Sequence, residues 1–126
     1  MGIATGLNPL AFIVTTDRER AKLFYGETLG LTKLREDPFA LVYDMAGISL
    51  NISTVEAHTP AAHTVLGWQT LDINAAARAL RDKGVTCSIY PGFGQDELGV
   101  WSVPDGGAKG VWFNDPDGNV LSLTEF

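Results

Sequence analysis

Polar and apolar residues alternate along two stretches, one closing each half of the chain. The first is Gly47-Ile48-Ser49-Leu50-Asn51-Ile52-Ser53, and the second is Gly118-Asn119-Val120-Leu121-Ser122-Leu123-Thr124. A period of two is typical of a strand with one buried face and one polar face. We therefore expect each half of the chain to end in a half-buried strand.

A β-rich run followed by a helix pattern also occurs twice. The runs at residues 10–17 and 65–72 both end in residues that favour the start of a helix. In the first run, Thr16 and Glu19 have the spacing of a capping box. In the second run, either Asp72 or Asn74 can serve as the N-cap.

The helices that follow are expected near Arg18–Leu29 and Ile73–Lys83. Each has an apolar face and a glycine just past its end, which is the usual place for a C-terminal glycine. The faces are Ala21, Phe24 and Tyr25, closed by Gly30, and Ile73, Ala76, Ala77 and Leu80, closed by Gly84.

Each half has room for two further strands between its helix and its last strand. We expect them near Thr32–Arg35, Phe39–Asp44, Thr86–Tyr90 and Lys109–Asn114. The glycine- and proline-rich segment Pro91–Gly107 predicts a long loop, with a short edge strand near Gly99–Val103. The order is βαβββ in both halves. The sequence thus predicts an α+β fold of two tandem modules, about 8–54 and 63–126, joined by a linker near Val55–Ala62 in a single domain over residues 1–126.

Composition narrows the class of partner. The chain has 126 residues, a formal net charge of −6 and a pI of about 4.7. Such a surface repels phosphate, so we expect no nucleic-acid partner and no membrane. The one cysteine, Cys87, can form no disulfide within the chain and is expected to be a buried, inert thiol. No signal peptide is evident, and a cytoplasmic location is expected.

Taken together, these residues resemble a known family. The duplicated pattern, Phe24-Tyr25 followed by Leu29-Gly30-Leu31, and the closing turn Phe113-Asn114-Asp115-Pro116-Asp117-Gly118-Asn119 are similar to the vicinal oxygen chelate superfamily. That group includes glyoxalase I, extradiol dioxygenases and bleomycin-resistance proteins. The resemblance covers nearly the whole chain and implies cupped mixed β-sheets with the helices outside.

The resemblance also implies four positions that hold a divalent ion in the metal-dependent members. Carried onto this sequence, they are Leu10, Asn51, Val65 and Ser122. Leucine and valine cannot bind a metal, and amide and hydroxyl oxygens are weak ligands without carboxylates beside them. His58 and His63 lie near the linker and are expected to be exposed, with no metal role. We expect neither a metal nor another cofactor.

Strand alternation predicts which side chains face away from the helices into a cavity. The expected face mixes apolar walls with neutral hydrogen-bonding groups, as a small-molecule site does. Aromatic residues strengthen this interpretation because they can stack a planar or cationic ligand. The candidate ligand-binding residues are Phe12, Tyr43, Asn51, Gln69, Trp101, Trp112 and Ser122, covered by the Phe93–Trp101 loop.

No catalytic constellation emerges, since no nucleophile–His–acid set, phosphate-binding loop or cysteine pair is present. The favoured hypothesis is a metal-free protein that binds a small molecule and sequesters a drug or natural product. A metal-dependent lyase or dioxygenase rests on the resemblance alone. A metal-free isomerase-like or epoxide-opening enzyme using Tyr43 or Asp44 is a further alternative. The resemblance implies a homodimer.

Overall fold

The computed structural model describes residues 2–126 and divides the chain into two compact units, Met1–His58 and Thr59–Phe126. Each unit is described by itself below. Among residues 2–126, no helix combines the length and the apolar character that crossing a lipid bilayer requires.

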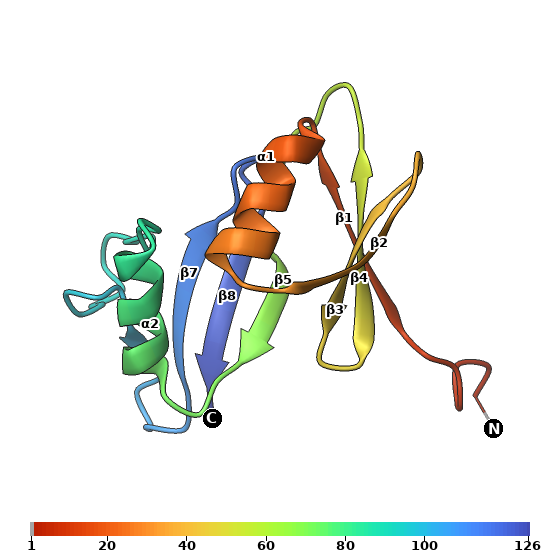
Figure 1. Cartoon of the computed structure of the whole chain (residues 1–126). Helices are drawn as coiled ribbons and strands as arrows, with labels where there is room; N and C mark the ends of the chain where they lie inside the picture. The colour runs from red at the N-terminus through yellow and green to blue at the C-terminus, as the bar shows by residue number, and fades with distance from the viewer. Residues whose placement is uncertain (1) are drawn as a thin grey trace. The chain divides into compact units, whose positions relative to one another are not determined.

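The first unit is one mixed sheet with one helical segment (Figure 1). Its elements are β1 (Leu10–Thr15), α1 (Arg18–Lys22), the π-helix η1 (Leu23–Thr28), β2 (Thr32–Glu36), β3 (Leu41–Met45) and β4 (Ile48–Thr54). The strand order is β1-β4-β3-β2, with β1 parallel to β4 and the other pairs antiparallel. This is the expected βαβββ order.

The second unit repeats that plan. Its elements are β5 (Thr64–Gln69), α2 (Ile73–Asp82), β6 (Trp101–Ser102), β7 (Lys109–Asn114) and β8 (Val120–Glu125). The sheet order is β5-β8-β7-β6, and again only the first pair is parallel. The predicted α+β fold of two βαβββ modules is therefore confirmed.

The helix starts are fixed by aspartates. The Asp72 carboxylate accepts from the Ala75 amide at 3.0 Å, so of the two predicted N-caps of α2 the structure uses Asp72. The capping box predicted at Thr16 is wrong. Asp17 caps α1 instead, accepting from the Arg20 amide at 3.2 Å. The chain enters this helix one residue later because Asp17 has the extended backbone that an N-cap requires.

The first helix also changes character halfway. The predicted helix at Arg18–Leu29 is α-helical only through Lys22 and then widens into η1, where the Leu29 amide donates to the Phe24 carbonyl at 2.8 Å. Its predicted apolar face is buried, and Phe24 and Tyr25 meet edge to face with ring centroids 5.0 Å apart. Gly30 follows with φ of +75°, a conformation that suits glycine.

One predicted strand is absent from the described residues. Thr86–Tyr90 is irregular, and it bonds to β7 through the Ser88 amide, which donates to the Trp112 carbonyl at 2.7 Å. The edge of the sheet beside β7 is taken instead by β6, within the predicted edge strand Gly99–Val103. The backbone of the irregular segment bonds to a side chain, as described below.

Strand residues of alternate positions form the core of each unit. Among them are Ile13, Leu50, Ile52, Leu66 and Leu121, all buried. In the second unit α2 covers β7 and β8, and Ile73 and Ala77 pack with Val111 and Val100. The other face of each sheet is left to carry the polar and aromatic side chains.

Candidate ligand-binding site

Four of the predicted binding residues share one face of the second sheet. Trp112 of β7 pairs with Ser122 of β8. Two residues earlier in β7, Gly110 pairs with Thr124 of β8 on one side and with Trp101 of β6 on the other. Gln69 also pairs with Thr124. Because Val111 and Leu123 point to α2, the alternate positions point away from it. Gln69, Trp101, Trp112 and Ser122 therefore lie on the face opposite α2.

Two aromatic residues from the long loop join the tryptophans on this face. Tyr90, Phe93, Trp101 and Trp112 form the group that we call the aromatic cluster. The ring centroids of Trp101 and Trp112 are 6.1 Å apart, and Phe93 lies 6.3 Å from Trp101 and 6.5 Å from Trp112. Tyr90 lies 5.7 Å from Trp112 and 5.6 Å from Phe93. All these distances are within the range of favourable ring contacts.

The aromatic cluster is partly open to solvent. Phe93 is 51% exposed, while Tyr90, Trp101 and Trp112 are half-buried. Gly110 leaves room beside the Trp112 ring, since a Cβ there would lie 3.9 Å from its nearest ring carbon. The arrangement offers flat apolar surface and aromatic edges to a planar molecule.

A glutamine holds the loop that carries the cluster. The Gln95 side-chain nitrogen donates to the carbonyls of Ser88 and Gly99, both at 2.8 Å. Its side-chain oxygen accepts from the Tyr90 amide at 2.7 Å. The side chain thus takes the place of a neighbouring strand, which explains why the predicted strand Thr86–Tyr90 does not form.

One acidic residue of the loop, Asp96, has a structural role as well. Asp96 accepts from the amides of Leu98 and Val100, both at 2.9 Å.

Sequence reasoning identified Phe93 and Trp101 but missed Tyr90 and Gln95. The signal for Tyr90 was its place at the start of the glycine-rich loop, whereas nothing in the sequence distinguishes Gln95 as a residue that bonds to the backbone.

In the first unit, Phe12 and Asn51 are paired across β1 and β4. Phe12 is 67% exposed and Leu10 is 57% exposed, so this face of β1 carries bare apolar side chains. Asn51 is 7% exposed, and its side-chain nitrogen donates to the Ala11 and Ser49 carbonyls at 3.3 and 3.4 Å. The side-chain nitrogen of Asn51 therefore bonds to the backbone of its own sheet.

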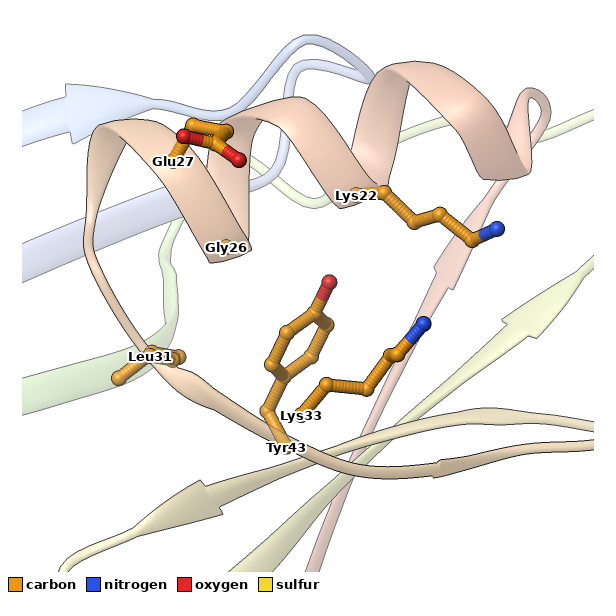
Figure 2. Close-up of a pocket in the computed structure, with 6 residues that line it drawn as sticks. All are labelled: Lys22, Gly26, Glu27, Leu31, Lys33 and Tyr43. Atoms are coloured by element: carbon orange, nitrogen blue, oxygen red, sulfur yellow. The ribbon is translucent and has the colours of Figure 1, made fainter.

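Tyr43 lies on the other face of the same sheet. It pairs with Leu50 on the helix-facing side, whereas Val42 pairs with Asn51. The structure therefore does not bring Tyr43 together with Phe12 and Asn51. Tyr43 lines a separate pocket beneath η1 (Figure 2), where burial raises the pKa of its phenol and keeps it protonated at neutral pH.

The two residues named for the enzyme alternative, Tyr43 and Asp44, do not face a common site. Successive residues of a strand point to opposite faces, so the two side chains diverge. Asp44 accepts from the Gly47 amide at 3.1 Å and serves the turn before β4.

The donor set at the four family-implied positions does not fit a divalent ion. Leu10 and Val65 carry no donor atom, and only the weak oxygens of Asn51 and Ser122 remain. Among residues 2–126, no group of three His, Cys, Asp or Glu side chains is arranged to hold a metal.

The remaining reactive side chains lie outside the aromatic cluster. Cys87 was expected to be buried but is half-buried beside the core under α2, and burial raises the pKa of its thiol, which disfavours the thiolate. His63 is exposed as expected, whereas His58 is half-buried rather than exposed, and it has an interaction partner.

Comparison with known proteins agrees with this fold. The model of the Glyoxalase/Bleomycin resistance protein/Dioxygenase superfamily matches residues 6–123. No curated protein sequence gives a significant match.

Solved structures are similar over nearly the whole chain. A glyoxalase/bleomycin resistance protein from Streptomyces sp. CB03234 is 28% identical with a TM-score of 0.67, covering 92% of this chain and 97% of that one. A superfamily member from Sphaerobacter thermophilus is 25% identical, covering 95% and 98%, with a TM-score of 0.69. Lactoylglutathione lyase from Agrobacterium tumefaciens shares the fold at 14% identity, with 95% and 93% covered and a TM-score of 0.71. The chain belongs to the glyoxalase/bleomycin resistance protein/dioxygenase superfamily.

Proposed function

We propose that this chain is a metal-free, cytoplasmic small-molecule-binding protein of the glyoxalase/bleomycin-resistance type. Its ligand is a planar, mostly apolar molecule such as a drug or natural product, and the protein acts by sequestering it. The observation that carries this proposal is the aromatic cluster on the open face of the second sheet.

The aromatic cluster suits a ligand better than it suits packing alone. Rings that serve only the core are buried, whereas Phe93 is 51% exposed and both tryptophans keep part of their surface in water. Gln69 and Ser122 share the face and supply neutral hydrogen-bonding groups. An apolar surface with a few polar groups is the usual composition of a ligand site.

The charge of the protein favours a neutral or cationic ligand. The chain carries a formal net charge of −6, which attracts cations and repels anions at long range. A cation placed over a tryptophan face gains further stabilisation from the ring.

The likeness to a glyoxalase/bleomycin resistance protein at 28% identity supports the same type of function here. The lyase and dioxygenase alternatives require a metal, and Leu10 and Val65 stand at two of the positions where the family places ligands. The binding function needs neither a metal nor a catalytic residue.

We also propose that the protein is a homodimer. Strand β1 is at the edge of its sheet, and Leu10 and Phe12 leave apolar surface exposed along it. An edge strand with bare apolar side chains is unfavourable in water unless something covers it. A second copy of the chain would cover it symmetrically.

Tryptophan fluorescence tests the binding proposal. Acridine orange, a planar cation, should quench the emission saturably, and Trp112→Ala should weaken its binding by about 1–3 kcal/mol through the loss of one aromatic contact. The matched control is Trp68→Ala, because Trp68 pairs with Leu123 on the face toward α2 and should leave the affinity unchanged. If affinity is the same in wild type and Trp112→Ala, the ligand does not bind at the proposed site.

A further inference from the structure

A pocket lies within the first unit, on the helix-facing side of its sheet. It has a volume of about 250 Å³ and is lined by Lys22, Gly26, Glu27, Leu31, Lys33 and Tyr43. Figure 2 shows the Tyr43 side chain extending from β3 toward the helical segment, with Lys22 and Lys33 beside it. Nothing in the proposed function uses this pocket.

The Tyr43 phenol is the first group that could bond to a ligand. The residue is 2% exposed, and its hydroxyl group makes no hydrogen bond to the described residues. Because no buried side-chain oxygen among those residues lacks a partner, this oxygen is reached by solvent through the pocket, where a ligand can replace water as its partner. Here the hydroxyl points into the pocket toward Gly26 (Figure 2). A bound molecule with an acceptor atom would provide that partner.

Gly26 keeps the space above this hydroxyl free. A Cβ at position 26 would lie 3.2 Å from the Tyr43 oxygen, which is tighter than an ordinary contact. Gly26 belongs to η1, whose wider turn is marked by the bond from the Leu29 amide to the Phe24 carbonyl. Wide turns of this kind are frequent at functional sites.

The two lysines supply further donors. The Lys22 ammonium group contacts Glu36 at 2.8 Å and Glu19 at 2.9 Å, and the Lys33 ammonium group contacts Glu36 at 3.3 Å. An ammonium group has three N–H donors. One N–H donor of Lys22 and two N–H donors of Lys33 therefore have no acceptor among residues 2–126.

The charged residues that line the pocket are Lys22, Lys33 and Glu27, an excess of one positive charge, which favours a single negative charge on the ligand. Behind them, Glu36 contacts Lys22, Lys33 and Arg18, and Glu19 contacts Lys22. Counted together, the three cations and the three carboxylates balance. A dianion such as phosphate would meet more repulsion from these acids than a carboxylate would.

We infer that this pocket binds a small aliphatic carboxylate, whose oxygens accept from the Tyr43 hydroxyl and the Lys33 ammonium group while its carbon chain lies against Leu31. The pocket is on the helix-facing side of the first sheet, and its residues all belong to the first unit. This inference therefore does not depend on the proposed function.

The test uses amide NMR spectra of the nitrogen-labelled full-length protein during titration with sodium butyrate, with sodium chloride added to hold ionic strength constant. The signals of Gly26, Leu31 and Tyr43 should shift saturably. Butanamide has the same size without the charge and should shift them far less. Tyr43→Phe and Lys33→Gln should each weaken butyrate binding roughly fivefold or more, the effect of losing one hydrogen bond.

Two matched variants complete the design. Lys83→Gln makes the same charge change at an exposed position at the end of α2, and it should leave the affinity for butyrate unchanged. Gly26→Ala narrows the pocket above Tyr43 and should weaken binding while the protein stays folded, as its amide spectrum would show. Shifts that do not saturate, an equal response to butanamide, or unchanged affinity in Tyr43→Phe or Lys33→Gln would overturn the inference.

Discussion

At the residue scale, one carboxylate organises the turn before the last strand. Asp115 is 5% exposed and accepts from the amides of Asp117 and Asn119 at 3.0 and 2.9 Å. Its second oxygen accepts from the Asn119 side chain at 2.8 Å. Gly118 completes the turn with φ of +85°, which suits glycine. This turn sets the start of β8 and hence the position of Ser122 beside Trp112.

Replacing Asp115 with alanine should therefore destabilise the protein. The change leaves buried donors without acceptors, and we expect a loss of about 2–4 kcal/mol in the free energy of unfolding, measured by chemical denaturation. Asp105→Ala is the control, because exposed Asp105 accepts from the Gly107 amide in a surface turn. It should change stability by less than about 1 kcal/mol. Equal stability in Asp115→Ala and wild type would contradict this account of the turn.

Individual site residues were predictable where strand parity governs them. Gln69, Trp101, Trp112 and Ser122 share a face because alternation and pairing leave them no other side. Tyr43, in contrast, does not lie on the same face as Asn51. Its pairing with Leu50 puts it on the helix-facing side, and the sequence alone does not reveal that register.

At the element scale, the loop between α2 and β6 shapes the aromatic face. Its backbone is held by the three hydrogen bonds of the Gln95 side chain rather than by strand pairing. Two of the four rings of the aromatic cluster, Tyr90 and Phe93, lie in this segment. The hydrogen bonds of Gln95 therefore also set the geometry of the proposed site.

Gln95→Ala should loosen this loop without unfolding the protein. Three lost hydrogen bonds, at about 1 kcal/mol each, should lower the free energy of local opening by about 2–3 kcal/mol and speed hydrogen exchange at the Tyr90 amide. Glu97→Ala, a substitution at a nearby exposed loop residue, should leave that exchange rate unchanged. If Tyr90 exchanges equally fast in Gln95→Ala and wild type, Gln95 does not hold the loop.

The elements themselves were largely predictable. Amphipathic periodicity and terminal glycines indicated both helical segments, and period-two alternation indicated β4 and β8. The departures arise where side chains compete with backbone pairing. Helix α1 begins after Asp17, whose carboxylate caps it, rather than after Thr16. At Thr86–Tyr90 the backbone bonds to the Gln95 side chain where a strand was predicted. The widening at η1 occurs where Phe24 and Tyr25 are buried, and local helix propensity does not predict it.

At the scale of the whole molecule, a duplicated unit carries two different surfaces. The first unit leaves Leu10 and Phe12 bare on an edge strand, and the second gathers four aromatic rings on its open face. The shared fold follows from the repeated pattern of apolar positions, whereas the differing surfaces come from the side chains between them. We therefore expect the first surface to serve assembly and the second to serve ligand binding.

Native mass spectrometry of the purified protein with acridine orange, recorded with and without EDTA, tests the central claim most directly. We predict a dimer that carries no divalent ion and keeps the bound dye after EDTA treatment, because Leu10 and Val65 cannot bind a metal and the aromatic cluster does not require one. About one zinc, nickel, iron or manganese ion per chain, with the dye lost when EDTA removes it, would contradict a metal-free binding protein.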